Sequence, residues 1–217
     1  MSTIVVVKKA NKAVIAADTQ TTFGTTKCGG KYISNKDKIL TFATNYIGIV
    51  GSSAHSNVWQ SIIRNYAAQL SFESLEAIFD TYVGLHPILK EKYFINAEQG
   101  KDDEAEYETS QIDALIANSA GIFGMYSWRE VFEYERFWAI GSGRPFALGA
   151  MSAVYDQLAS PEEIAEIGIK AACEFDSCSS LPMTLYVVDL QKEVVAPANL
   201  VAGANLEVRE TSSEGGG

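Results

Sequence analysis

The order in which two kinds of apolar pattern follow each other constrains the fold of this chain most. Short runs of consecutive apolar residues come first, then two stretches in which apolar residues recur about every four positions, and this succession is then repeated. The first pattern is typical of strands buried on both faces, and the second of helices with one buried face. The chain therefore predicts strands, two helices, strands, two helices and strands.

Most of the predicted strands form hairpins, because only short polar stretches separate one apolar run from the next. By contrast, residues 19–30 are rich in Thr and Gly and are predicted to be a loop. The predicted strand pairs are residues 4–7 with 13–17, 39–42 with 46–50, 112–117 with 122–126, and 185–190 with 193–196.

The predicted helices come in two pairs. In the first pair, apolar residues recur from Val58 to Leu70, and a second helical pattern covers residues 75–89. In the second pair, one stripe runs from Phe146 to Leu158, and the next helix begins at Ser160. This last start is well marked, because Ser at the N-cap is followed by Pro at the first position and Glu three residues after the cap.

Hairpins combined with paired helices favour an α+β protein of four layers, an αββα sandwich in which two antiparallel sheets are flanked by helix pairs. A doubly wound parallel sheet would alternate strand and helix one by one. We expect one domain over residues 1–200, with an acidic loop inserted at about residues 96–108. Residues 201–217 end in three glycines and are predicted to form a tail that is disordered at its end.

Composition excludes several classes of function. The chain has 217 residues, enough for a substantial core, and a formal net charge of −10 that would repel phosphate backbones. We therefore expect no nucleic-acid partner. The longest apolar run is far shorter than the ~18 residues of a membrane helix, and no secretory signal is visible, so no membrane partner and a cytoplasmic location are expected.

Cysteine and histidine are scarce. The cysteines are Cys28, Cys173 and Cys178, an odd number that argues against a disulfide framework. The two histidines, His55 and His86, make no metal-ligand pattern with them, so neither a metal nor another cofactor is expected. Two histidines also leave little scope for histidine-based catalysis.

The amino terminus offers a different catalytic base. A serine hydroxyl needs a neighbouring base, and the chain has no Gly-x-Ser-x-Gly elbow. Removal of Met1 would give Ser2 a free α-amine, with a reference pKa of ~7.7–8.0 that a nearby lysine would lower further. Ser2 could then act as nucleophile and base at once.

The same residues open a series of motifs that resembles the proteasome β-type and HslV peptidases. The chain reads Ser-Thr-Ile-Val-Val-Val from residue 2 and Ala-Ala-Asp-Thr-Gln-Thr-Thr-Phe-Gly at 16–24, which places Asp18 sixteen residues after Ser2. Lys38-Ile39 then precedes a strand, and Gly-Ile-Val-Gly-Ser-Ser follows at 48–53. Further matches are Ala-Ile-Gly-Ser-Gly-Arg-Pro-Phe-Ala at 139–147 and Asp-Ser-Cys-Ser at 176–179.

These matches run in order through nearly the whole chain and imply the αββα fold of N-terminal-nucleophile hydrolases. The segment 85–135, with its acidic insert, resembles the bacterial β-proteasome homologues more than HslV. The resemblance also implies site roles: Ser2 as nucleophile, Lys38 lowering the pKa of nucleophile and amine, and Asp18 holding the lysine. Further implied roles are Ser142, Asp176 and Ser179 ordering the terminal amine, the Gly51 and Ser52 backbone as oxyanion donor, and Thr22 pairing an extended substrate.

Simpler roles for these residues remain open. Asp18 could cap a turn, Ser142 could cap a helix, and Asp176 or Ser179 could end one. The chain also departs from the family pattern, because its nucleophile would be Ser where Thr is usual and Ser52 stands where a second glycine is common. Four extra residues precede Lys38, so Lys31 and Lys36 are weaker candidates for the catalytic lysine.

The leading hypothesis is a threonine-type endopeptidase subunit whose Ser2 sites face the chamber of a homo-oligomeric ring. Its substrates would be peptides or unfolded proteins, and an ATPase unfoldase, whose identity the sequence does not give, could be a partner. Two alternatives are a non-catalytic subunit of the same fold and an N-terminal-nucleophile amidase that acts on small molecules.

Overall fold

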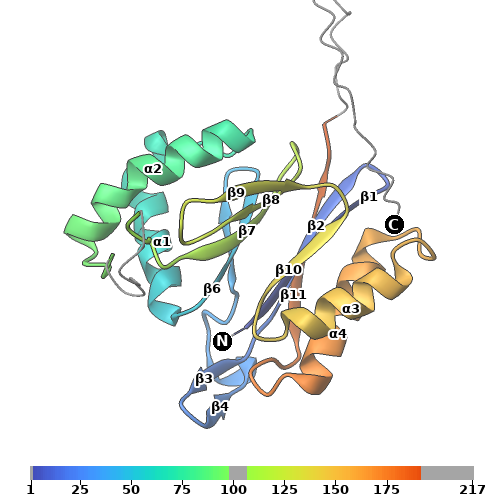
Figure 1. Cartoon of the computed structure of the whole chain (residues 1–217). Coiled ribbons are helices and arrows are strands. Elements are labelled where there is room, and N and C mark those ends of the chain that lie inside the picture. The colour runs from blue at the N-terminus through green and yellow to red at the C-terminus, as the bar shows by residue number, and fades with distance from the viewer. Residues whose placement is uncertain (1, 98–106, 192–217) are drawn as a thin grey trace, which may run out of the picture.

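Two antiparallel sheets lie face to face in the computed structural model, and a pair of helices covers the outer side of each (Figure 1). The structure describes residues 2–97 and 107–191. Separate apolar clusters fill the three spaces between the four layers. The α+β class and the αββα sandwich predicted from the sequence are therefore confirmed.

The four-stranded sheet has the strand order β10-β1-β2-β11. Its central hairpin consists of β1 (Thr3–Lys9) and β2 (Lys12–Asp18). The flanking strands, β10 (Phe137–Gly141) and β11 (Met183–Asp189), both come from the second half of the chain. This sheet therefore brings the amino terminus beside segments more than 130 residues away, and the pairing Thr3 with Gly141 is one such contact.

The five-stranded sheet has the order β5-β6-β7-β8-β9, and each strand pairs with its neighbour in the chain. The two successive hairpins predicted for this part of the chain are therefore confirmed, with an additional strand at one edge. The bounds are β5 (Ile39–Phe42), β6 (Asn45–Val50), β7 (Asp113–Ala117), β8 (Ile122–Met125) and β9 (Val131–Tyr134).

The consecutive apolar residues of β1 face two different layers. Ile4 and Val6 belong to the cluster between the sheets, whereas Val5 and Val7 belong to the cluster under the second helix pair, and all four are 0% exposed. A slip of one residue would exchange these faces, but both faces here are buried. The register of β1 is therefore fixed by side-chain shape and by pairing on both edges.

One helix pair packs on each sheet, and serine side chains cap the first and the last of the four helices. Ser52 Oγ accepts from the Ala54 amide at the start of the first helix. At the start of the last helix Ser160 Oγ accepts from the Glu163 amide, which confirms the N-cap predicted for Ser160. The bounds are α1 (Ser53–Tyr66), α2 (Leu75–Lys92), α3 (Arg144–Val154) and α4 (Pro161–Phe175), with 3₁₀ turns at η1 (Gly30–Tyr32) and η2 (Ala67–Gln69).

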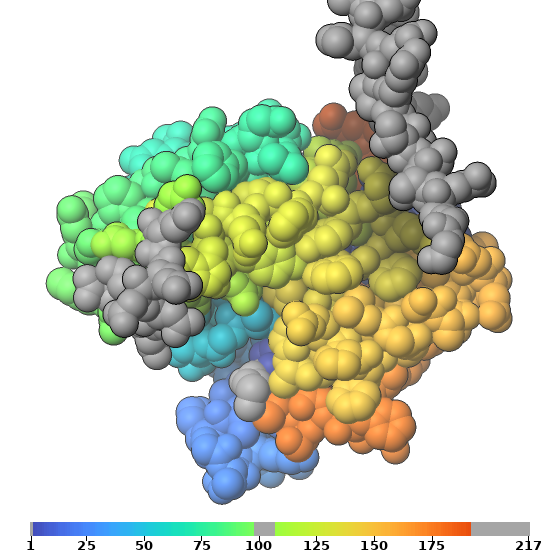
Figure 2. All heavy atoms as spheres, in the orientation of Figure 1, coloured from blue at the N-terminus to red at the C-terminus, as the bar shows by residue number. Residues whose placement is uncertain are grey.

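The prediction that residues 19–30 form a loop is wrong. This segment contains a small hairpin, β3 (Thr21–Phe23) and β4 (Thr26–Cys28), that projects from the body of the molecule (Figure 2). Gly24 supplies the positive φ of 58° at its two-residue turn, and the threonines are β-branched residues that suit strands. The high Thr and Gly content hid two short strands that carry almost no apolar residues.

Some predicted features lie outside the described residues. They are the strand at 193–196, most of the acidic loop at 96–108, and the tail at 201–217. That residues 1–200 form one domain stays a prediction. No helix in the described part of the chain is both long and apolar enough to cross a membrane.

Candidate active site

Asp18 ends β2 and is completely buried, with four hydrogen-bond donors around its carboxylate. Its Oδ1 accepts from the Thr3 amide at 2.9 Å and from Lys38 Nζ at 2.7 Å. Its Oδ2 accepts from the amides of Gln20 at 2.9 Å and Ser180 at 3.2 Å. The carboxylate thus joins the beginning of β1, the end of β2, the segment before β11 and the lysine side chain.

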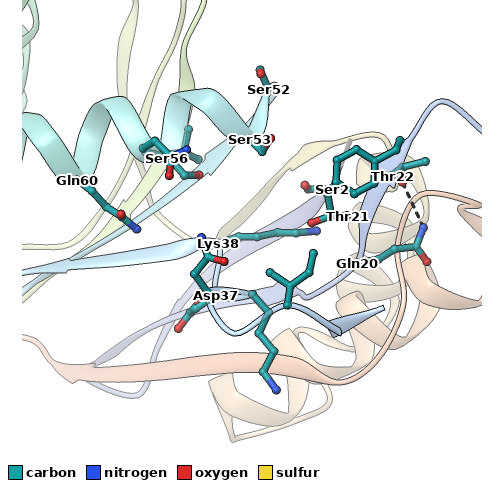
Figure 3. A pocket seen from close by; sticks show the side chains of 17 residues that line it. Ser2, Gln20, Thr21, Thr22, Asp37, Lys38, Ser52, Ser53, Ser56 and Gln60 are labelled. Carbon is teal, nitrogen blue, oxygen red and sulfur yellow. Dashed lines mark hydrogen bonds between the residues drawn. The ribbon is translucent and has the colours of Figure 1, made fainter. Parts of the chain in front are cut away.

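Lys38 lies directly before β5, and its side chain is only 12% exposed. Burial lowers the pKa of Lys38, and the Asp18 carboxylate opposes that shift. In Figure 3 the Lys38 side chain extends along the pocket toward Ser2. The arrangement places a cationic group beside the beginning of the chain.

Ser2 immediately precedes β1 and is 7% exposed. Its carbonyl accepts a hydrogen bond of 2.9 Å from the amide of Ser142. Gly141 has a φ of 96°, and a Cβ atom at this position would lie 1.8 Å from the Ser2 carbonyl oxygen. Only glycine therefore allows this close approach, which holds Ser2 in place from β10. The predicted removal of Met1 concerns a residue outside the described part of the chain.

A second polar cluster lies next to the first. Ser142 Oγ and Ser179 Oγ both donate to Asp176 Oδ2, at 2.8 Å and 2.7 Å. Ser179 Oγ also lies 2.7 Å from Thr3 Oγ1, so the cluster reaches the residue that follows Ser2. The helix-cap alternative for Ser142 is wrong, because the N-cap of α3 is Gly143 and the Ser142 hydroxyl is committed to Asp176.

A cleft of about 390 Å³ opens beside the first of these clusters. Ser2 and Lys38 line it, and so do Thr22 of β3, Gly51 and Ser52. Ser53, Ser56 and Gln60 of α1 face the cleft from another side (Figure 3).

The two predicted oxyanion residues stand at the beginning of α1. Gly51 has a φ of 106°, and Ser52 follows as the helix N-cap. Backbone amides at a helix N-terminus have no partner within the helix and favour negative charge. The position therefore suits an oxyanion donor.

The structure brings together all nine residues predicted for the site. The three candidate lysines differ in the groups that they contact. Lys38 contacts Asp18, whereas Lys36 lines the cleft and the Lys31 ammonium lies 5.0 Å from the centre of the Tyr32 ring. Among the described residues, no group of three or more His, Cys, Asp and Glu side chains could hold a metal ion.

The sequence motifs did not predict three further residues at the site. Thr3 is fully buried and bonds both polar clusters, through its amide to Asp18 and its hydroxyl to Ser179. Gln20 links β3 to the loop after α4, because its Nε2 donates to the Ser177 carbonyl at 2.9 Å. Asp37 lines the cleft beside Lys38. Position next to a predicted site residue was the available signal for Thr3 and Asp37.

Comparison with solved structures finds close relatives. A structure of Thiobacillus denitrificans BPH, a bacterial proteasome homologue, has a TM-score of 0.81 and 36% sequence identity, covering 87% of this chain and 98% of that one. A structure of the same protein in complex with epoxomicin has a TM-score of 0.77 and 36% identity, covering 88% of this chain and 100% of that one.

A more distant match shows the fold alone. It is the eukaryotic HslV of Trypanosoma brucei, with a TM-score of 0.61 and 20% identity over 86% of this chain and 99% of that one. No protein-family model matches the chain. The 36% identity over nearly the full length of the Thiobacillus protein decides the assignment: the chain belongs to the proteasome β-type, HslV-like family of N-terminal-nucleophile peptidases.

Proposed function

We propose that the chain is a peptidase subunit in which Ser2, freed by removal of Met1, is both nucleophile and general base. The observation that carries the proposal is the contact of 2.7 Å between Lys38 Nζ and the buried Asp18 carboxylate, in a cleft that Ser2 also lines. A buried ion pair costs desolvation free energy, so its place beside a hydroxyl nucleophile favours a catalytic role.

The Asp18 carboxylate is not the base in this proposal. Its two oxygens offer about four acceptor sites, and four donors already occupy them. No acceptor site is left over for a proton from Ser2 Oγ. The α-amine of Ser2 is the remaining group at the head of β1 that can take this proton, and the Lys38 ammonium lowers the pKa of the amine through like-charge repulsion.

The reaction then has two stages. The α-amine accepts the Oγ proton, directly or through a water, while Oγ attacks the peptide carbonyl carbon. The amine passes the proton to the leaving nitrogen, the C–N bond breaks, and an ester on Ser2 remains. Water, deprotonated by the same amine, attacks the ester carbonyl, and the released Oγ recovers the proton.

The neighbouring groups support these steps. An amide at Gly51 or Ser52 would stabilise the oxyanion, and loss of one such donor costs ~100–1000-fold in rate. The cluster of Ser142, Asp176 and Ser179 would order the amine. The edge of β3 at Thr22 would pair with an extended peptide by backbone hydrogen bonds.

The assembly state and location form part of the same proposal. The bacterial homologue and HslV support oligomers with peptide substrates, and we propose a homo-oligomeric ring whose Ser2 sites face an inner chamber. Substrates would be peptides or unfolded proteins, and an ATPase unfoldase would be a partner only if the ring must unfold them. We place the protein in the cytoplasm, where its three free cysteines would stay reduced.

Covalent labelling tests the mechanism. The purified protein is incubated with epoxomicin, the ligand named for the Thiobacillus homologue, and analysed by intact mass and peptide mapping. We expect a mass that lacks Met1, an adduct on Ser2, no adduct on Ser2→Ala and a retained adduct on Ser2→Thr. Unmodified protein that keeps Met1 would instead favour the non-catalytic subunit.

A second measurement separates the peptidase from a small-molecule amidase. Electron microscopy and size-exclusion chromatography report the assembly, and an unfolded protein substrate reports endopeptidase activity. We expect a ring that degrades the unfolded protein into peptides. A monomer that reacts with the inhibitor but leaves the unfolded protein intact would favour the amidase.

A further inference from the structure

Asp37, directly before the proposed catalytic lysine, has a carboxylate with three hydrogen-bond donors. Its Oδ1 accepts from the Ile39 amide at 2.9 Å and from Thr184 Oγ1 at 2.9 Å, and its Oδ2 accepts from Tyr186 Oη. The first donor is local, whereas the other two come from β11, in the opposite sheet. The side chain thus connects the two sheets beside the cleft, which Asp37 also lines.

The local bond fixes the backbone of Lys38. A carboxylate that accepts from the amide two residues later forms an Asx turn, and Lys38 is the residue enclosed by it. On the other side, the Lys38 carbonyl accepts from the Ile49 amide at 3.2 Å. Residues 33–38 form no regular ladder, so these side-chain and backbone bonds hold Lys38 before β5 begins.

The distant bonds connect Lys38 to its partner Asp18. In the ladder between β2 and β11, Met183 is opposite Asp18 and Thr184 is opposite Ala17. The strand that holds Asp37 is therefore the immediate neighbour of the strand that carries Asp18. Both ends of the Lys38–Asp18 ion pair are tied to this one pair of strands.

Tyr186 is itself held in position. Its ring stacks on Tyr46 of β6, with 4.7 Å between the ring centroids. The Asp37 carboxylate, with burial, raises the pKa of Tyr186 to about 12. The phenol therefore stays a hydrogen-bond donor over the whole pH range in which a peptidase would be assayed.

We propose that Asp37 is a positioning residue, which through Thr184 and Tyr186 sets the place of Lys38 relative to Asp18 and Ser2. The inference rests on the proposed function, since it concerns the lysine that lowers the pKa of the Ser2 amine. Asp37 acts through Lys38. The titratable groups that face Lys38 are Asp18 from β2, Cys173 from α4, and Asp176 at the end of α4.

The test compares Asp37→Ala, Asp37→Asn and Tyr186→Phe with the wild-type protein. Asp37→Ala removes all three bonds, Asp37→Asn keeps an oxygen for the Ile39 amide, and Tyr186→Phe removes one bond from β11. We expect kcat to fall about 100-fold for Asp37→Ala and about tenfold for the other two, with KM changed less than about threefold. Tyr93→Phe is the matched control, because it removes a tyrosine hydroxyl that donates to Ser61, between α2 and α1.

The pH profile distinguishes positioning from a general loss of structure. When Lys38 moves away, the Ser2 amine loses its cationic neighbour, so the acid limb of kcat/KM should shift to higher pH in the Asp37 variants. Variants that lose activity in proportion to folded protein, with an unchanged acid limb, would overturn the inference. Unchanged kcat in Asp37→Ala would do the same. If the wild-type protein is not labelled on Ser2 by epoxomicin, the proposed function itself would be overturned instead.

Discussion

Lys38 and Asp18 pair beside the cleft with side chains that are 12% and 0% exposed, whereas Lys90 and Glu108 pair near α2 with side chains that are 50% and 33% exposed. The distances are similar, at 2.7 Å and 2.6 Å. Exposed pairs contribute little to stability, whereas removing one partner of a buried pair leaves a charge without compensation. Two ion pairs with similar N–O distances are therefore expected to differ in what the loss of one partner costs, because only the exposed pair has water to replace that partner.

The largest effect is expected from Lys38→Met. Without the ammonium group, the activity should fall about 100- to 10,000-fold, measured as the rate of peptide hydrolysis. The free energy of unfolding should also fall by about 3 kcal/mol, because the Asp18 carboxylate stays buried with its three amide donors only.

Lys36→Met is the matched control for that prediction. Lys36 lines the same cleft, but the lysine that contacts Asp18 in the described part of the chain is Lys38. Lys36→Met should therefore keep most of the activity. If Lys36→Met is inactive and Lys38→Met is active, the assignment of the lysine is wrong.

Gly141→Ala should have the next largest effect. The new Cβ would meet the Ser2 carbonyl oxygen, and the φ of 96° is unfavourable for alanine, so we expect a loss of about 2–3 kcal/mol in unfolding free energy. Denaturant unfolding measures it. Gly149→Ala in α3 is the control, since nothing lies within 4 Å of the Cβ that this substitution adds, and alanine favours helices. A Gly141→Ala protein as stable as this control would contradict the close approach at Ser2.

Ser179→Ala should have a smaller effect. It removes the hydroxyl that bridges Thr3 and Asp176, which should cost about 1–2 kcal/mol in stability and about tenfold in the rate of Ser2 labelling. Ser177→Ala, two residues earlier in the same loop, should label at the normal rate. Equal rates for the two variants would remove Ser179 from the proposed site.

Glu108→Gln should have the smallest effect, and it tests the exposed ion pair between Lys90 and Glu108. Hydrogen bonds from Lys90 and His86 lower the pKa of Glu108 from 4.5 to about 2. A lowered pKa stabilises the fold above 4.5, and this contribution is lost as the pH falls toward 2.

The melting temperature measures that pH dependence. The difference between Glu108→Gln and the unchanged protein should be small near pH 7 and vanish near pH 2. Glu166→Gln, which breaks the exposed pair with Lys170 in α4, is the control. A change at pH 7 as large as that of Lys38→Met would abolish the contrast between the two regions.

Much of the fold could be predicted because strands buried on both faces and helices with one buried face leave different patterns. The small hairpin was missed because neither pattern applies to it. Phe23 is its one large apolar residue and is 63% exposed, so burial left no periodic signal. Turn chemistry at Gly24 was the remaining indication.

The candidate site was predictable only where motifs marked it. Asp18 and Lys38, which two of these motifs marked, are in contact although twenty residues separate them, and their catalytic roles stay a prediction. The contacts of Asp37 could not be predicted, because Thr184 and Tyr186 lie 147 and 149 residues away and reach it only through the packing of two sheets. The residues around Asp37 in the sequence do not show how the two sheets pack against each other, and these contacts depend on that packing.

The way Ser2 is held also has a practical consequence for anyone who produces this protein. Its carbonyl accepts from the Ser142 amide and lies close against the backbone of Gly141, and the residue is 7% exposed, so it has little room to move. A purification tag fused ahead of Met1 would leave from this enclosed position and would block the α-amine on which the proposed chemistry depends. Such a tag should be removed by a protease that leaves Ser2 as the first residue before any assay.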